Sequence, residues 1–94
     1  MQVKVRMMGV LRKAKGLKEV FLDVPEGSSV GFIIKTLIGE NESLRSVLWD
    51  SEVDSPSPNA LVMLDGIEIS NLQGIDTKVE PESELVLLSV VHGG

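Results

Sequence analysis

The chain has 94 residues, of which 43% are hydrophobic, 24% are charged and none is cysteine. A chain of this length buries one compact core, so we expect residues 1–94 to form a single domain. Nine basic residues against fourteen acidic ones give a net charge of −5, which argues against nucleic acid or anionic membranes as partners. No apolar run approaches the roughly 18 residues of a membrane span, and the start lacks a secretory signal, so the sequence predicts a cytoplasmic protein.

The residues that usually carry enzymatic chemistry are scarce. Without cysteine there is no disulfide, no thiolate metal site and no cysteine nucleophile. The only histidine, His92, stands so close to the end of the sequence that no Ser-His-Asp arrangement is expected around it. No GxxxxGK run occurs, and a solvated loop or strand edge explains the alternating Glu80, Glu82 and Glu84. The sequence therefore predicts no enzyme, no metal site and no bound cofactor.

Two strands are expected at the start of the chain. From residue 2 to residue 7, Gln, Lys and Arg alternate with Val, Val and Met, which is the period-two pattern of a half-buried strand. A loop is expected over residues 9–16. A second alternation over residues 20–24 ends at Pro25-Glu26-Gly27, where a turn is favoured. Two such strands joined by a loop predict an antiparallel hairpin.

The period of the apolar residues then changes to that of a helix. Ser28 or Ser29 offers an N-cap hydroxyl, and Gly39 stands where a helix commonly ends. The apolar residues between them share one stripe of the helix: Val30, Ile33, Ile34, Leu37 and Ile38. A shorter helix is expected over residues 43–49, with an apolar side formed by Leu44, Val47 and Leu48.

The following segments are expected to form a loop, a hairpin and an irregular stretch. Residues 50–59 are rich in acids, serines and prolines and predict an exposed loop. Asp65-Gly66 between residues 60–64 and 67–69 indicates a hairpin with a type I′ turn. Residues 70–81 predict an irregular segment that packs on the core through Leu72, Ile75 and Val79. Four further side chains are interpreted as core fillers: Met7, Met8, Met63 and Phe32.

The apolar run over residues 84–91 predicts a final, central strand. The resulting order of elements fits an α+β domain, with a mixed sheet of about five strands and one main helix packed on one face. The first and last strands can lie side by side and parallel in the middle of that sheet. This is the ββαβ order of the β-grasp, or ubiquitin-like, fold, followed here by a flexible tail over residues 92–94.

The sequence ends in Gly93-Gly94, directly after the predicted central strand. A free carboxylate is a poor acyl donor, whereas an acyl-adenylate made with ATP can be attacked by a sulfur or amine nucleophile. Glycine suits a tail that must thread into a partner's active site, because it has no Cβ to clash. We therefore expect Gly94 to be the reactive acyl group and Gly93 its flexible neighbour, with the chemistry in the partner. The alternative is that the two glycines are only a frayed end.

The sequence resembles the sulfur-carrier and protein-modifier branch of the β-grasp fold, which includes MoaD, ThiS and the archaeal small modifier proteins. The similar segments are spread over most of the chain: VKVRMMGVLR at 3–12, Val24-Pro-Glu-Gly27, Leu64-Asp-Gly-Ile67, Leu72 to Thr77, and Glu84 to Gly94. Two segments depart from the pattern of MoaD-like chains. Glu80 to Glu84 replaces an Asp-Gly-Asp-type turn, and Val90-Val91 stands where prolines often precede the tail.

The resemblance implies a monomeric protein that a MoeB-like or ubiquitin-activating-like enzyme adenylates at Gly94, with ATP used by that enzyme. A sulfur donor could then convert the adenylate to a thiocarboxylate, for molybdenum cofactor biosynthesis with a MoaE-like synthase subunit, for thiamine or for tRNA thiolation. A lysine of a target protein could instead attack the adenylate and form an isopeptide bond. The alternative is a non-conjugating ubiquitin-like module that binds partners through its sheet.

Overall fold

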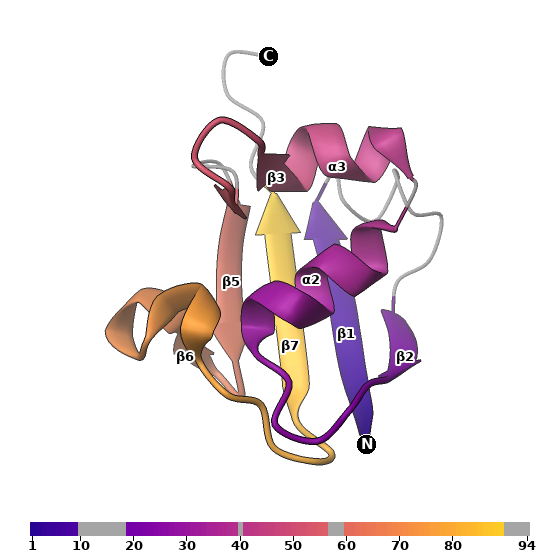
Figure 1. The fold of residues 1–94 in the computed structure, drawn as a ribbon, viewed down its shortest axis with the longest axis vertical. Coiled ribbons are helices and arrows are strands. Elements are labelled where there is room, and N and C mark those ends of the chain that lie inside the picture. Colours follow the sequence, from indigo (N-terminus) through magenta and orange to yellow (C-terminus); the bar gives the residue numbers. More distant parts are fainter. Residues whose placement is uncertain (10–18, 40, 57–59, 90–94) are drawn as a thin grey trace.

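The computed structural model describes residues 1–9, 19–39, 41–56 and 60–89 (Figure 1). Its main sheet has five strands: β1 (Gln2–Gly9), β2 (Glu19–Asp23), β5 (Ala60–Leu64), β6 (Ile67–Glu68) and β7 (Glu84–Ser89). Their order is β2-β1-β7-β5-β6, and β1 and β7 are parallel while the other neighbours are antiparallel. The predicted mixed sheet with parallel first and last strands at its centre is confirmed.

The main helix, α2 (Val30–Ile38), begins and ends where the sequence indicates. The Ser29 hydroxyl accepts a hydrogen bond from the Phe32 N–H at 3.2 Å, and Gly39 follows the last turn with a φ of 50°. All five residues of the predicted apolar stripe are buried. The stripe therefore faces the sheet, and the burial of this face against the strands stabilises a helix whose β-branched residues have modest helix propensity.

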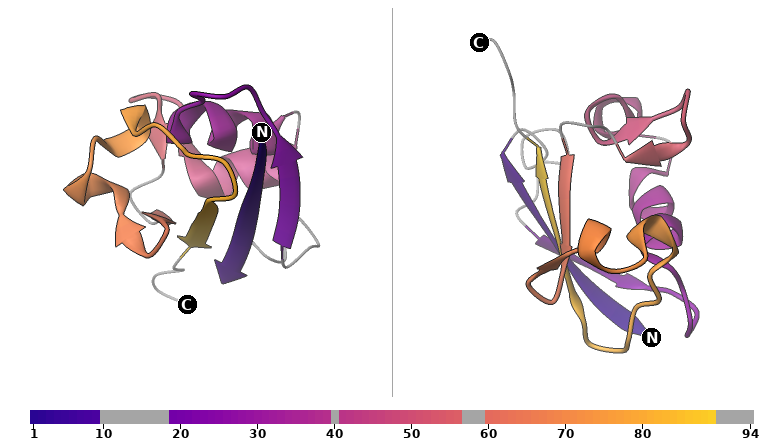
Figure 2. Two further views of the ribbon diagram at one scale, coloured as in Figure 1. Left: turned by 90° about the horizontal axis from the view of Figure 1, so that it is seen from below. Right: turned by 90° about the vertical axis from the view of Figure 1, so that its left-hand side faces the viewer.

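A second helix, α3 (Glu42–Leu48), follows α2. The side chain of Asn41 caps it by accepting a hydrogen bond from the Leu44 N–H at 2.9 Å. Leu44 and Leu48 are fully buried, as the sequence predicts. Both helices lie on the same side of the sheet (Figure 2), and no helix within the described ranges is long and apolar enough to cross a membrane.

The core lies between the helices and one face of the sheet, called here the inner face. Every second residue of the central strands points into it and is fully buried: Val3, Val5 and Met7 from β1, and Leu85 and Leu87 from β7. Because aromatic residues are scarce, the core consists mainly of Val, Ile, Leu and Met. Trp49 is its one large aromatic side chain among the described residues.

The predicted Asp65-Gly66 turn also anchors the start of β7. Both residues have positive φ values, 49° and 86°, as a type I′ turn requires. The Asp65 N–H donates to the Glu84 carbonyl at 2.9 Å, and the Glu84 N–H donates to the Asp65 carboxylate at 2.9 Å. The turn joining β5 and β6 is therefore hydrogen-bonded to the strand that leads to the end of the chain.

Some expectations are wrong. The segment 50–59 is not simply a loop, because β3 (Trp49–Asp50) pairs with β4 (Ser55–Pro56) in a small separate hairpin. The segment 70–81 is not wholly irregular, because the 3₁₀ helices η1 (Ile69–Asn71) and η2 (Gly74–Asp76) lie at its start and middle.

Four apolar side chains are also misplaced by the sequence interpretation. Met63 is only partly buried and lies outside the core, because it falls on the outer side of the β5 alternation. Leu72 is 40% exposed, whereas Ile75 packs against the core and Val79 is buried. Met8 and Phe32 are 46% and 50% exposed rather than core fillers. Their positions follow from geometry: Met8 falls on the outer side of the β1 alternation, and Phe32 on the outer side of α2.

Candidate functional site

The side of the sheet opposite the helices is the first candidate site. We call this side the open face. The side chains of β1, β2, β5 and β7 that do not point into the core point to it, and they include Lys4, Arg6 and Met8 from β1, Phe21 from β2, Leu61 and Met63 from β5, and Glu84, Val86 and Leu88 from β7. Figure 2 shows both helices and the small hairpin on the other side of the sheet. No described element covers the open face.

Strand register arranges these residues in rows across the sheet. Leu61, Leu88 and Met8 stand side by side in the row closest to the end of β7. In the next row, Met63 and Val86 are followed by Arg6. The apolar part of the open face is therefore concentrated where the central strand ends, and we call these five apolar residues, Leu61, Met63, Val86, Leu88 and Met8, the apolar patch.

Charged residues occupy the other end of the open face. Lys4 Nζ lies 3.5 Å from Glu19 Oε2 and 3.6 Å from Glu84 Oε2, and Arg6 Nη1 lies 3.8 Å from the same Glu84 oxygen. These side chains are each more than a third exposed, so solvent screens their attraction and they contribute little to stability. The open face thus combines an apolar patch with a neighbouring group of paired charged side chains. Many protein interfaces have this composition.

The structure fixes the start of the predicted reactive tail. Ser89, the last residue of β7, is paired with Gly9 on one side and with Ala60 on the other. The predicted site residues His92, Gly93 and Gly94, and the expected continuation of the strand to Val91, lie outside the described residues. The structure therefore shows where the tail begins, beside the apolar patch, and does not test the roles predicted for its glycines.

A second group of side chains comes together on the helix side of the molecule. Lys35 from α2 lies 3.2 Å from Asp54 Oδ1, and the indole N–H of Trp49 donates to the same oxygen at 3.2 Å. The Lys35 ammonium also lies 5.2 Å from the centre of the Trp49 ring. The hydrogen bonds from Lys35 and from Trp49, with the positive charge of Lys35, hold the pKa of the Asp54 carboxyl below its usual value.

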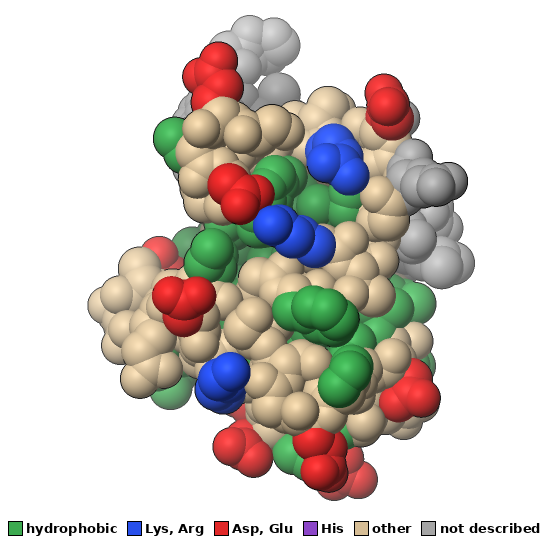
Figure 3. All heavy atoms as spheres, viewed as in Figure 1, with side chains coloured by type: hydrophobic (Ala, Val, Ile, Leu, Met, Phe, Trp, Pro, Cys, Tyr) green, Lys and Arg blue, Asp and Glu red, His purple; other side chains and the backbone are tan. Residues whose placement is uncertain are grey.

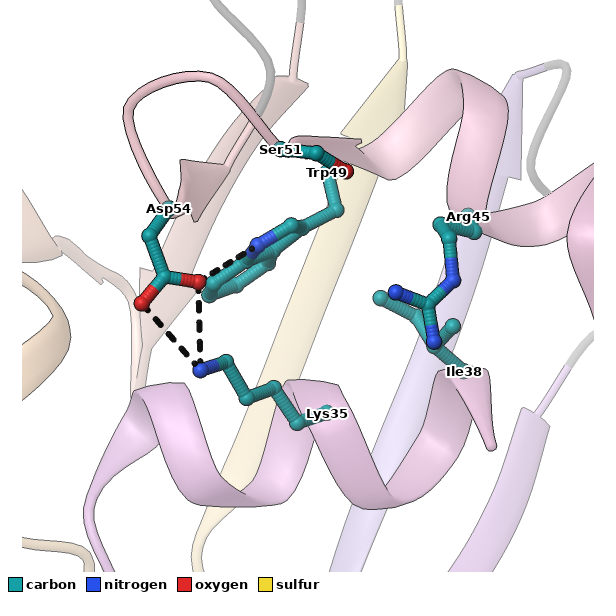
Figure 4. Close-up of a pocket in the computed structure, with 6 residues that line it drawn as sticks. All are labelled: Lys35, Ile38, Arg45, Trp49, Ser51 and Asp54. Carbon is teal, nitrogen blue, oxygen red and sulfur yellow. Dashed lines mark hydrogen bonds and ion pairs between the residues drawn. The ribbon is translucent and has the colours of Figure 1, made fainter. Parts of the chain in front are cut away.

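This group borders a pocket of about 300 Å³ between α2, α3 and the β3–β4 hairpin (Figure 4). Its lining residues are Lys35, Ile38, Arg45, Trp49, Ser51 and Asp54. Sequence reasoning missed this site because it treated residues 50–59 as a loop without function. Trp49, the only tryptophan, next to a run of acids was the one available signal. Within the described ranges, no group of three or more His, Asp or Glu residues could hold a metal ion.

Comparison with known proteins identifies relatives of the whole chain. No protein-family model matches it. It is 31% identical to ubiquitin-related modifier 1 of Yarrowia lipolytica and 25% identical to small archaeal modifier protein 3 of Haloferax volcanii. Each alignment covers 100% of both chains.

Several solved structures share the fold of this chain. Small archaeal modifier protein 1 of Haloferax volcanii superposes with a TM-score of 0.85 at 20% identity, covering 100% of both chains. The protein of the same name from Methanosarcina acetivorans gives 0.82 at 26% identity, covering 99% of this chain and 96% of that one. A chain of the BexX/CysO complex of Amycolatopsis orientalis gives 0.75 at 22% identity, covering 98% and 99%.

These findings confirm the β-grasp fold and the resemblance found in the sequence. The relatives are small modifier proteins that are not themselves enzymes. The chain belongs to the family of ubiquitin-like proteins that includes ubiquitin-related modifier 1 and the small archaeal modifier proteins.

Proposed function

We propose that a partner enzyme activates this protein by ATP-dependent adenylation of the Gly94 carboxylate in the cytoplasm. The activated protein then acts as a modifier of target-protein lysines, as a sulfur carrier, or as both. The observation that carries this proposal is the placement of the apolar patch: an uncovered apolar surface lies beside the end of the central strand that leads to Gly93-Gly94.

The proposed chemistry has two steps. A carboxylate oxygen of Gly94 attacks the α-phosphorus of ATP, which forms the acyl-adenylate and releases pyrophosphate. A nucleophile then attacks the acyl carbon and AMP leaves. A lysine amine gives an isopeptide bond and loses a proton. Hydrosulfide gives a thiocarboxylate directly and also loses a proton, whereas a persulfide gives an acyl disulfide, which a thiol then cleaves to the thiocarboxylate while forming a disulfide with the donor sulfur. Both routes place the catalytic groups and ATP in the partner.

The length of the tail limits where that partner can bind. Gly94, the residue that we propose is activated, stands five residues after Ser89, and these residues span at most about 18 Å when extended. The activating site must therefore come close to the end of β7. The apolar patch is the uncovered apolar surface nearest to that point among the described residues, so we place the adenylating enzyme on the open face.

The relatives support the modifier route most directly, because both are named as modifiers and match along the whole chain. A chain of the same fold has been solved in a complex with another protein, the BexX/CysO complex of Amycolatopsis orientalis, which supports a partner-dependent function. A sulfur-carrier route would use the same acyl-adenylate with a different nucleophile and a MoaE-like or tRNA-thiolating recipient. The two routes therefore share their first step and separate only at the second.

Mass spectrometry on protein recovered from its native cells tests the proposal. Intact mass shows whether the mature chain ends at Gly94 and whether a form exists with one terminal oxygen replaced by sulfur. Conjugates of the wild-type protein are hard to detect after digestion with trypsin. No Lys or Arg follows Lys78, so trypsin would leave the long remnant 79–94 on each target lysine. The His92→Arg variant solves this, since trypsin then leaves only Gly-Gly on the modified lysine.

The matched control is the His92→Arg chain without Gly93 and Gly94. Gly-Gly remnants on target lysines that vanish in this control establish the modifier role. A thiocarboxylate without remnants establishes the carrier role. A tail found only as an unmodified carboxylate, also under sulfur demand and stress, contradicts the proposal and favours a non-conjugating interaction module.

A further inference from the structure

The pocket between α2, α3 and the β3–β4 hairpin lies on the helix side of the molecule, away from the open face. In the space-filling view of this side, Lys or Arg side chains lie beside hydrophobic ones in a hollow of the surface (Figure 3). The close-up shows Trp49 and Arg45 on opposite sides of the pocket, with Lys35 and Ile38 along α2 beneath them (Figure 4). The proposed activation at Gly94 uses none of these residues.

The two cations of the pocket differ in how their charges are balanced. Lys35 is neutralised by Asp54, which it approaches to 3.2 Å. Arg45 donates one hydrogen bond, from Nη2 to the Gly39 carbonyl at 3.3 Å, and no carboxylate of the described residues lies within 4.0 Å of it. A guanidinium has five N–H donors and stays charged at any physiological pH, so with respect to residues 1–9, 19–39, 41–56 and 60–89 Arg45 retains free donors and an unbalanced positive charge.

The shape and charge of the pocket limit what it can bind. Two cations and one carboxylate leave the lining net positive in a chain whose net charge is −5. A volume of about 300 Å³ is at the lower end of the range for ligand pockets and suits one or two side chains better than a nucleotide. One unbalanced cation matches one carboxylate, and the planar guanidinium fork binds a carboxylate with two parallel hydrogen bonds.

We propose that this pocket is a second docking site, which binds a glutamate or aspartate of an extended peptide segment from a partner protein. The peptide carboxylate binds Arg45, and the neighbouring part of the peptide lies over the hollow whose floor is formed by the largely buried Trp49 and Ile38. Because the site lies on the helix side, it stays accessible while an enzyme holds the open face and after the tail is joined to a target. This inference goes beyond activation at Gly94 and does not depend on it.

A titration followed by NMR tests the site on the full-length ¹⁵N-labelled protein. Trp49 is the only tryptophan, so its indole N–H signal needs no assignment. The probes are an acetylated, amidated peptide with Leu-Glu-Leu at its centre, the same peptide with Leu-Gln-Leu, free glutarate and inorganic phosphate. We expect the Leu-Glu-Leu peptide to shift the Trp49 indole and the Arg45 and Ser51 amide signals saturably, with about tenfold or more weaker binding of the Leu-Gln-Leu peptide.

Two substitutions make the test specific. Arg45→Gln should weaken binding of the Leu-Glu-Leu peptide about tenfold or more, and Arg6→Gln on the open face should leave it unchanged. Deletion of Gly93-Gly94 should also leave it unchanged, which separates this site from the proposed activation. The proposal is overturned if the shifts do not saturate up to millimolar peptide, or if the Arg45→Gln variant binds the Leu-Glu-Leu peptide equally well. It is also overturned if the shifts are confined to the open face, or if phosphate or glutarate binds and the Leu-Glu-Leu peptide does not.

Discussion

The two faces of the sheet carry the same types of apolar residue, which form the core on the inner face and an uncovered surface on the open face. On the inner face, Val5, Met7 and Leu87 are fully buried against the helices, and their burial stabilises the fold. On the open face, Met8 and Leu88 stand next to them in the same strands, yet no described element covers them. An uncovered apolar patch does little for the stability of the isolated protein, and this is why we place the proposed partner enzyme on the open face.

The largest expected effect compares two neighbouring leucines of β7. Leu87→Ala should lower the free energy of unfolding by about 2–5 kcal/mol, because it leaves a cavity in the core. Leu88→Ala should lower it by less than about 1 kcal/mol, because solvent fills the space. Urea denaturation of both variants checks the difference. Similar losses at the two positions would show that the open face is packed against something in the isolated protein.

The next effect concerns the layer that covers the inner face. A Cβ on Gly31 of α2 would lie 3.2 Å from both the Cβ and the carbonyl oxygen of Ile75, where α2 meets η2. The clash should outweigh the higher helix propensity of alanine, so Gly31→Ala should destabilise the protein by about 1 kcal/mol. Thr36→Ala, on the exposed side of the same helix, is the control and should change stability by about half of that or less. A more stable Gly31→Ala variant would mean that α2 and η2 do not approach so closely.

A smaller effect depends on pH and involves the outer side of the helix layer. Because the pKa of Asp54 is lower in the folded protein than in the unfolded chain, its ionised form favours folding. This contribution should be complete above the unfolded value of about 4 and should disappear as the pH falls through the lower folded pKa. The stability advantage of the wild type over Asp54→Asn should therefore shrink on acidification. Urea denaturation from pH 6 downward checks this, and an advantage that grows towards acid would contradict it.

The smallest expected effect lies among the charges of the open face. Glu84→Gln removes the carboxylate shared by Lys4 and Arg6 but leaves the backbone hydrogen bonds of residue 84 to Asp65 in place. Because these pairs are exposed, the loss of stability should be about 0.5 kcal/mol or less at low salt and should vanish at high salt. Denaturation at two ionic strengths measures it. A loss that persists in high salt would mean that these charges are structural.

The elements that the sequence predicts well are those with a strong period. The alternation of β1 and the apolar stripe of α2 identify the side chains that face the core, and Asp65-Gly66 identifies its hairpin, because each pattern has one favourable geometry. The order of these elements along the chain was enough to predict the β-grasp fold.

The rest depends on contacts between distant residues. The β3–β4 hairpin has only two paired positions on each side and is held by the hydrogen bond of Trp49 to Asp54 and the ion pair of Lys35, which no local pattern reveals. The pocket beside Arg45 was missed because α2, α3 and the hairpin come together only in the folded chain. Met8 is different, because the alternation of β1 already places it on the side opposite to Met7, and its interpretation as a core filler relied on residue type alone.

The most direct test of activation at Gly94 is ATP–pyrophosphate exchange with the adenylating enzyme isolated from the native cells. Deletion of Gly93-Gly94 should abolish exchange without unfolding the protein. Met8→Ser in the apolar patch should raise the protein concentration for half-maximal exchange about fivefold or more, whereas Phe32→Ser, equally exposed on the helix side, should not change it. Exchange that survives the deletion, or that responds equally to the two serine variants, would contradict the account.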